Sequence, residues 1–455
     1  RSVFQCRDFF MKKVCLISLT IFILLLNSCQ NRPEATLMLD NPNTLVNTAY
    51  PSTAVKLPAT WTPRPTTSNP PEPSDTPWPT ATSEMSGTAP ATPDLIIGEG
   101  KSGRYPDIQT SLVFVRQDGE RMALYSLEQG SAVPRRLLLG KRDVFSPLWS
   151  PDGTQLAYLK TAEYEAYQAE ILGSSWPSRL DPVDLFLYVA GLETPLGDPG
   201  TMFISDLSWS PDSTMIAYSG GEIDPSGDPI SGKNIYQTNI ISLRQSQVIK
   251  TSQGNVGCSS PTWDPSSSLI LARCRGLMAI GLTAAHPDGS DPFWFEAQAG
   301  AVRWRPDGKE ILIVNGWYPL ATIDPDYVLQ YGRNLNLDTA DLSSELSALG
   351  VQEKYVLGFS WAPGHADRFL IQSEDLIQVV DREQGNVLSL SGDFNNLEGQ
   401  FSWGPAGNQI ALAYYDGEDA EIGVLNFDQG TFYPLTVNEV DDLMPAWQPF
   451  QTGEE

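Results

Sequence analysis

The chain has 455 residues, with 55 acidic and 29 basic side chains and a formal net charge of −26. This acidic excess repels phosphate backbones and anionic lipid headgroups, so no nucleic-acid partner is expected and basic partners or cations are favoured. An apolar content of 41% is enough to bury a core. Two histidines are too few for a histidine-built metal site or a proton relay.

The first 29 residues have the pattern of an export signal. Residues 1–10 precede a better initiator at Met11 and are interpreted as an upstream artefact. After two lysines, residues 14–26 form an apolar run too short to span a bilayer comfortably, followed by Asn, Ser and Cys29. The L-N-S-C run resembles the lipobox of bacterial lipoproteins. That resemblance implies diacylation of Cys29 and an extracytoplasmic protein held at the cell membrane or envelope by lipid alone; a plain signal peptide is the alternative.

Residues 30–104 are predicted to be a disordered linker. Proline and threonine dominate this segment, and no period of 2 or 3.6 residues survives in it. Such a composition cannot bury enough apolar surface to offset chain entropy, and it favours extended polyproline-like conformations. We therefore expect a spacer that holds the domain at residues 105–455 away from the membrane.

A W-x-P motif recurs beyond residue 105 at intervals of 41 to 60 residues. Periods of this length with short strands are typical of propeller blades. In residues 150–153, Ser-Pro-Asp-Gly has the residue types of a type I turn, and a nearly continuous apolar run follows it. Each tryptophan is predicted to pack between blades. The motif tryptophans are Trp149, Trp209, Trp263, Trp304, Trp361, Trp403 and Trp447.

The two ends of the repeat region determine the expected blade count. Residues 112–139 offer only three strands, and residues 443–450 offer a single one. Placing the C-terminal strand innermost in the N-terminal blade closes the ring and removes two exposed edges. The sequence therefore predicts an all-β, seven-bladed propeller of four-stranded antiparallel blades.

The repeats resemble those of TolB-like propellers, whose blades carry W-S-P-D-G-x-x-I-A-F. Residues 149–158 (WSPDGTQLAY) and 209–218 (WSPDSTMIAY) match that pattern closely. The resemblance covers about 340 residues and implies a fold rather than a function. Three departures from TolB are expected: no segment of this sequence resembles the N-terminal α/β domain of TolB, seven blades are predicted where TolB has six, and residues 26–29 resemble a lipobox.

Insertions at residues 161–181, 221–233, 316–326 and 416–420 are all predicted to lie between the second and third strands of a blade, on one face of the ring. Loops on a rigid scaffold concentrate function, so this face is the predicted partner face. Its carboxylates and aromatic rings suit sugars or basic peptides. The candidates are Tyr164, Tyr167, Trp176, Asp224, Asp228, Trp317, Tyr318, Asp324, Asp326, Asp416, Glu418, Asp419, Glu439, Asp441 and Asp442.

No cofactor and no specific metal site are predicted. The acidic loops offer oxygen ligands that suit calcium, but no D-x-D-x-D-G loop occurs among them, so a solvated acidic rim is the favoured interpretation. Both histidines, His286 and His365, lie in turns predicted for the opposite face, which argues against a catalytic triad or a histidine-metal lyase site.

Cys258 and Cys274 flank a hairpin whose turn centres on Ser266, so they are expected to face each other across two strands. An exported protein reaches a compartment that permits disulfides. A disulfide is therefore predicted, with two buried thiols as the alternative.

These features favour a monomeric, non-catalytic propeller that binds a protein, peptide or glycan partner in the cell envelope. One alternative is a carboxylate-based glycan hydrolase or lyase acting in the propeller mouth, which needs a pair of carboxylates about 5 to 10 Å apart. Another is a structural assembly scaffold. A serine hydrolase is disfavoured, because the nearest match to G-x-S-x-G begins at Gly358 and belongs to a blade motif.

Overall fold

The computed structural model describes residues 96–97 and 108–451, apart from internal gaps. The gaps are at 132, 139, 141, 162–182, 198–199, 223–232, 251–254, 277–279, 297–300, 316–317, 326–327, 329–339, 353–354, 395–396, 398 and 418. The predicted signal peptide with Cys29, and the predicted linker apart from Ile96–Ile97, lie outside the described residues. None of the helices in the described part is long and apolar enough to cross a membrane.

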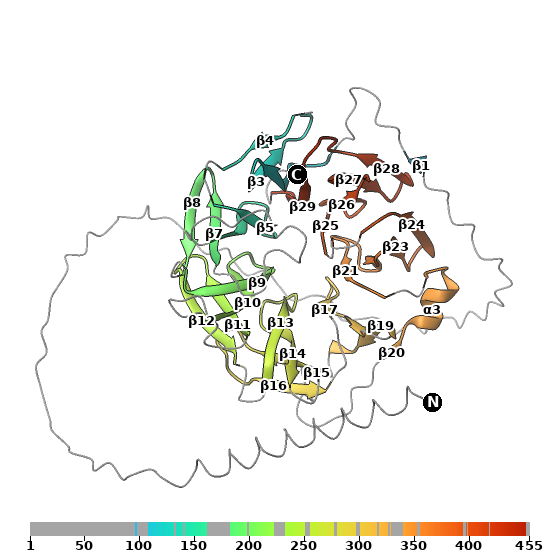
Figure 1. Ribbon diagram of the computed structural model, residues 1–455. Helices are drawn as coiled ribbons and strands as arrows, with labels where there is room; N and C mark the ends of the chain where they lie inside the picture. Colours follow the sequence, from blue (N-terminus) through green and yellow to red (C-terminus); the bar gives the residue numbers. More distant parts are fainter. Residues whose placement is uncertain are drawn as a thin grey trace, which may run out of the picture. The chain divides into compact units, whose positions relative to one another are not determined.

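Seven antiparallel blades surround a common axis, which confirms the predicted fold (Figure 1). From the innermost strand outward, the first two blades are β29 (Asp442–Trp447), β2 (Leu112–Asp118), β3 (Arg121–Leu127), β4 (Arg135–Arg136); and β5 (Val144–Trp149), β6 (Leu156–Thr161), β7 (Val183–Val189), β8 (Leu192–Leu196). The next two are β9 (Met202–Trp209), β10 (Met215–Glu222), β11 (Asn234–Asn239), β12 (Arg244–Ile249); and β13 (Asn255–Trp263), β14 (Ile270–Gly276), β15 (Ile280–Ala285), β16 (Phe293–Glu296). The last three are β17 (Ala301–Trp304), β18 (Ile311–Asn315), β19 (Tyr318–Ile323), β20 (Ala340–Asp341); β21 (Gly358–Trp361), β22 (Arg368–Gln372), β23 (Leu376–Asp381), β24 (Asn386–Ser391); and β25 (Phe401–Trp403), β26 (Gln409–Tyr415), β27 (Ala420–Asn426), β28 (Thr431–Pro434). A short helix, α3 (Ser343–Ala348), lies between β20 and β21.

The middle strands of the blades are buried on both faces. Every residue of β6, β22, β23 and β27 is buried, which matches the unbroken apolar runs that follow each turn. Most hydrophobic clusters combine residues of two neighbouring blades; one, for example, joins Phe145 and Leu159 to Trp209 and Tyr218. The core of the ring is therefore a series of blade-to-blade interfaces.

The motif tryptophans pack between blades, as predicted. Six of the seven are buried, and Trp149 is half-buried. The Trp209 Nε1–H donates to the carbonyl of Leu148 in the preceding blade at 3.0 Å, and the Trp263 Nε1–H donates to that of Ser208 at 3.1 Å. These indoles therefore contribute packing and a hydrogen bond to the same interface.

The turns after the tryptophans are tight because their own side chains satisfy the backbone. The Gly153 N–H donates to the Ser150 carbonyl at 2.9 Å, and Gly153 has φ 70°, a conformation in which glycine is unstrained. The Ser150 hydroxyl accepts the Gln155 N–H at 3.0 Å and donates to Asp152 at 2.5 Å. The turn also touches the next blade, since the Asp152 N–H donates to the Ser213 hydroxyl at 3.1 Å.

The ring closes where the two ends of the domain meet. β29 pairs with β2, with Leu112 opposite Trp447 and Arg116 opposite Asp442. The Arg116 guanidinium donates two hydrogen bonds to the Asp442 carboxylate, at 2.6 Å each. We call this junction of β29 and β2 the seam; an ion pair crosses it as well as the strand ladder.

One short strand comes from the predicted linker. β1 (Ile96–Ile97) pairs in parallel with β28, so that Ile96 lies opposite Thr431 and Ile97 opposite Phe432. This pairing extends the blade of β25–β28 to five strands and covers its outer edge. The linker sequence has no alternation of apolar and polar residues, so a strand as short as β1 could not be predicted from it.

The structure joins Cys258 and Cys274 in a disulfide, and the two residues lie directly opposite each other in β13 and β14. The bond closes a loop with a sequence separation of 16 residues. On the loop-entropy model, replacing both cysteines with alanine is expected to lower the free energy of unfolding by about 3 kcal/mol, measured by urea-induced unfolding. Peptide mapping after alkylation without reductant provides the check: two alkylated cysteines would contradict the bond.

Candidate binding surfaces

Successive strands of a blade run in opposite directions, so the loops divide between two faces. Loops that join a second strand to a third, or a fourth to the next first strand, lie on one face, which we call the loop face. The other connections form the turn face.

Eight of the predicted partner-face residues lie outside the described residues, namely Tyr164, Tyr167, Trp176, Asp224, Asp228, Trp317, Asp326 and Glu418. Tyr318 is described only by its backbone.

The structure differs from the sequence expectation for residues 316–326. β19 begins at Tyr318, so only two residues separate it from β18, and Asp324 follows the end of β19 on the turn face. Gly316 and Pro319 are turn-forming residues and led to the expectation of a long loop. The packing of Leu320 and Ile323, each 1% exposed, instead makes this segment a strand.

Four carboxylates gather on the loop face beside the seam. Asp416 and Asp419 lie between β26 and β27, Asp441 immediately precedes β29, and Asp393 follows β24. The Tyr415 N–H donates to the Asp393 carbonyl at 3.4 Å, and the Ala420 N–H donates to Asp441 Oδ1 at 3.0 Å, so these loops are in contact. Burial raises the pKa of Tyr415, and the carboxylates of Asp441 and Asp393 raise it further. Asp393 and Asp416 are exposed and the other two are half-buried. We call these four residues the acidic cluster; sequence analysis missed Asp393 because only the ring brings its loop there.

A buried polar network lies directly beneath the acidic cluster. Glu421 and Asp442 are fully buried. The Asn438 backbone N–H donates to Glu421 Oε1 at 2.5 Å, and its side-chain Nδ2 donates to Glu421 Oε2 at 3.1 Å and to Asp442 Oδ2 at 2.9 Å. Desolvation raises the pKa of Glu421 to about 7, and the nearby carboxylates of Asp442 and Asp419 add to that shift. Asp442, predicted as a partner-face residue, is therefore part of the seam.

Calcium binding was the less favoured interpretation of the acidic loops. Carboxylate oxygens of Asp416, Asp419 and Glu421 lie within 4.8 Å of one another. Both Glu421 oxygens already accept hydrogen bonds from Asn438, so this carboxylate is held toward the seam. Among the described residues, three carboxylates are thus close together, and one of them is engaged in the seam network.

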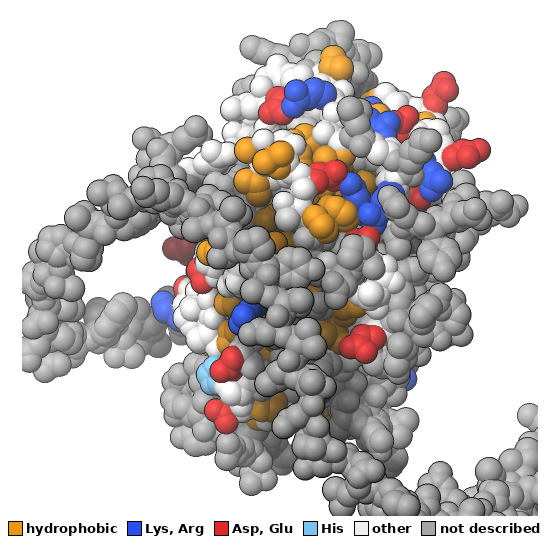
Figure 2. Space-filling view, turned by 90° about the vertical axis from the view of Figure 1, so that its left-hand side faces the viewer, with side chains coloured by type: hydrophobic (Ala, Val, Ile, Leu, Met, Phe, Trp, Pro, Cys, Tyr) orange, Lys and Arg blue, Asp and Glu red, His pale blue; other side chains and the backbone are white. Residues whose placement is uncertain are grey.

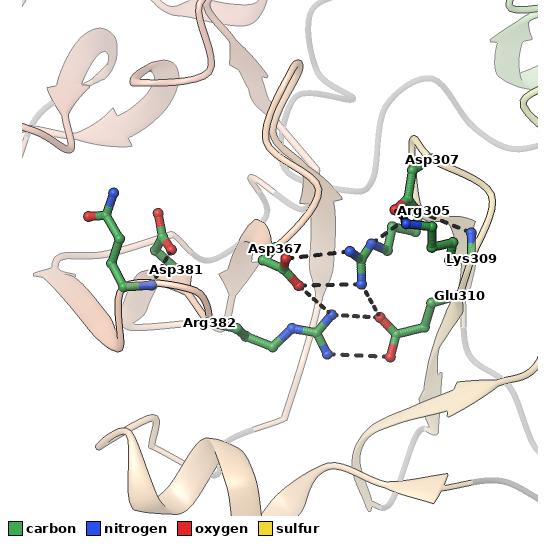
Figure 3. A network of polar contacts seen from close by, with 8 residues as sticks. Arg305, Asp307, Lys309, Glu310, Asp367, Asp381 and Arg382 are labelled. Atoms are coloured by element: carbon green, nitrogen blue, oxygen red, sulfur yellow. Dashed lines mark hydrogen bonds and ion pairs between the residues drawn. The ribbon is translucent and has the colours of Figure 1, made fainter. Parts of the chain in front are cut away.

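The turn face has a groove of about 780 Å³ between the blades of β17–β20 and β21–β24. Figure 3 shows that a network of ion pairs crosses it. Arg382 pairs with Glu310 at 2.6 Å and with Asp367 at 3.3 Å, and Arg305 pairs with the same two carboxylates at 3.4 and 3.3 Å. The charges compensate each other across the blade interface, so the network stabilises the contact between blades. Asp324 also lines this groove.

The outer rim near β8 and β12 has a mixed surface. Figure 2 shows hydrophobic side chains there among acidic and basic ones. Leu192, the first residue of β8, and Ile241, in the turn between β11 and β12 of the next blade, are 72% and 80% exposed. Both histidines lie in turns of the turn face, as expected: the His365 ring nitrogen Nε2 is 3.1 Å from the Ala406 carbonyl oxygen, and His286 Nδ1 is 2.9 Å from that of Ser268.

Comparison with known proteins finds no matching family model and no matching curated protein. Solved structures with a similar fold include TolB from Acinetobacter baumannii, which is 14% identical over 76% of this chain and 68% of that chain, with a TM-score of 0.44. A putative TolB from Agrobacterium tumefaciens is 15% identical over 67% of this chain and 88% of that chain, with a TM-score of 0.34. A prolyl endopeptidase is 13% identical over 66% of this chain and only 43% of its own, with a TM-score of 0.40. At these identities and TM-scores the likenesses carry no argument about function.

Proposed function

We propose that this chain is a non-catalytic binding propeller, anchored in the cell envelope through a lipid on Cys29, that holds a basic peptide or protein segment on its loop face. The acidic cluster carries this proposal. It places four carboxylates from three loops on one face of a closed ring. The formal charge of −26 extends the same sign over the whole protein and would steer a basic partner toward it.

A carboxylate-based hydrolase is supported less well. Among the described residues, Glu421 is the candidate general acid, because its pKa is raised to about 7 and a pKa near the working pH suits that role. Its side chain is fully buried and bonded to Asn438, so a substrate would have to displace the seam network to reach it. We therefore propose a binding role for the loop face.

The test is a cross-linking pull-down from envelope extracts with the full chain and with a variant that carries Asp393→Asn, Asp416→Asn and Asp419→Asn. A second variant replaces Trp176, Trp317 and Tyr318 with alanine. We expect the acidic-cluster variant to recover the same basic partner at least about tenfold less well, and recovery by the unaltered chain to fall with added salt.

The matched control removes the same three charges from exposed positions on the turn face, by Asp288→Asn, Asp291→Asn and Glu383→Gln. This control should recover the partner as well as the unaltered chain does. Equal recovery by the acidic-cluster variant would refute the proposed binding face. Hydrolysis of a glycan panel that is abolished by Asp416→Asn would replace the binding role with an enzymatic one.

A further inference from the structure

The groove on the turn face lies between two blades and is large enough to hold a small molecule. Its volume of about 780 Å³ is within the range of ligand-binding clefts. In the ion-pair network that crosses it, two guanidinium groups face two carboxylates, those of Glu310 and Asp367 (Figure 3). These four charges compensate one another, so the other residues that line the groove decide which ligand it favours.

Thr322 in β19 places a buried hydroxyl in this groove. It pairs with Leu312 across β18 and β19, and Leu312 and Leu320 belong to the same hydrophobic cluster as Trp361 of the next blade. Alternate residues of a strand point to the same face, so Thr322 also points toward that blade. It is 8% exposed and lines the groove, and its hydroxyl forms no hydrogen bond with any residue that the structure describes. A buried hydroxyl without a partner is costly, so a ligand group that bonds to it is bound favourably.

Three exposed carboxylates line the same groove from three separate elements. Asp324 follows the end of β19, Glu345 lies in α3, and Glu383 lies in the turn between β23 and β24. Within the described part of the chain, Glu345 and Glu383 form no ion pair. The ammonium group of Lys309, the remaining cation of the groove, pairs with Asp307 at 3.6 Å. Beyond the network, the groove therefore has an excess of negative charge.

These three carboxylates do not converge on a single point, as they would in a metal site. Among the described residues, a group of three carboxylates with oxygens within 4.8 Å of one another occurs near the seam, and the groove carboxylates form no such group. A ligand that pairs with more than one of them must therefore carry positive charges at separate positions along an extended molecule.

Linear polyamines meet this requirement. Each ammonium group has a positive charge and several N–H donors, so it can pair with a carboxylate and donate to a hydroxyl. The formal charge of −26 attracts such cations and repels the anions that Arg305 or Arg382 would otherwise favour. We propose that the turn-face groove binds a linear polyamine, whose ammonium groups pair with Glu345 and Glu383 and donate to the Thr322 hydroxyl. This site does not depend on the function proposed for the loop face.

Isothermal titration of the full chain at pH 7 tests this with putrescine, spermidine and spermine. Butylamine and Mg²⁺ are the comparisons, because the first has a single charge and the second is compact. We expect at least one polyamine to bind at least about tenfold more tightly than both comparisons, because several charge-assisted contacts replace one. A carbodiimide joins amines to carboxylates that they contact. It should couple that polyamine to Glu345 or Glu383 in preference to Asp393 or Asp416, as located by peptide mass spectrometry.

Glu345→Gln with Glu383→Gln should weaken the best polyamine at least about tenfold, and Thr322→Val should weaken it at least about threefold. Thr322→Val should not lower the urea-unfolding midpoint, because its hydroxyl bonds to no described residue. The matched control, Asp288→Asn with Asp291→Asn, removes two charges from exposed positions elsewhere on the turn face and should leave the affinity unchanged.

Three results would overturn the site. The first is that no polyamine binds more tightly than both comparisons. The second is that either groove variant, with an unchanged unfolding midpoint, binds as well as the unaltered chain or no less well than the control variant. The third is that the carbodiimide couples the polyamine mainly to the acidic cluster.

Discussion

Replacing Arg116 with methionine is expected to lower the free energy of unfolding by about 3 kcal/mol at pH 8. The substitution keeps most of the side-chain volume and removes the cation that faces Asp442 across the seam. Asp442 is fully buried, so its charge would have no compensation, and it would share Asn438 with a second buried carboxylate, Glu421. The pKa of Glu421 is raised to about 7, so this carboxylate is protonated at pH 5 and no longer competes with Asp442 as a second buried charge. The loss of stability should therefore be smaller when unfolding is repeated at pH 5.

The matched control is Arg136→Met in the same blade. Arg136 pairs with Asp118 at 2.5 Å, but the two side chains are 33% and 37% exposed, so water compensates the charge that remains. A loss of less than about 1 kcal/mol is expected for such a pair. The double change Arg116→Met with Asp442→Leu should recover much of the stability that the single change loses, because no buried charge is left unpaired. Equal losses for the two single variants would contradict the role assigned to the seam.

Replacing Glu421 with glutamine is expected to change how stability depends on pH. In the folded protein the pKa of Glu421 is raised to about 7, above its ordinary value of 4.5. The folded state therefore binds more protons than the unfolded state between these values, and Glu421 makes the protein less stable as the pH rises from 4.5 to 7. The glutamine variant lacks this titration.

The free energy of unfolding of Glu421→Gln, relative to that of the unaltered chain, should therefore rise by about 2–3 kcal/mol between pH 4.5 and pH 8. Urea-induced unfolding at several pH values measures it. Glu120→Gln, at an exposed turn position of the seam blade, should show the same difference at every pH. A relative stability of Glu421→Gln that stays constant across this range would show that the glutamate does not titrate there.

The repeated local chemistry of the chain was sufficient to predict its architecture. A tryptophan with a proline two residues later recurs seven times, and an apolar run of strand length follows the first six of these motifs. Each unit needs neighbours to bury its faces, so a closed ring follows. The same spacing predicted that Cys258 and Cys274 lie opposite each other, because a hairpin turn centred between two residues places them in register. These predictions depend on short-range geometry, which sequence order specifies directly.

The limits of β19 near Pro319 were harder to predict, because proline and glycine indicate a loop. In the structure, the burial of Leu320 and Ile323 makes this segment a strand. Asp442 was predicted to lie on the partner face because Glu439 and Asp441 precede it in a connection between two blades. Its partner Arg116 is 326 residues away, and only pairing of β29 with β2 brings the two together.

The sequence by itself therefore determined the blade repeat, the ring closure and the sign of the protein's charge, because these follow from periodicity and composition. Tertiary structure alone decided which charges are buried and which carboxylates gather beside the seam. The physical reason is that desolvation and Coulomb energy depend on distances between residues remote in the chain, and the closed ring fixes those distances.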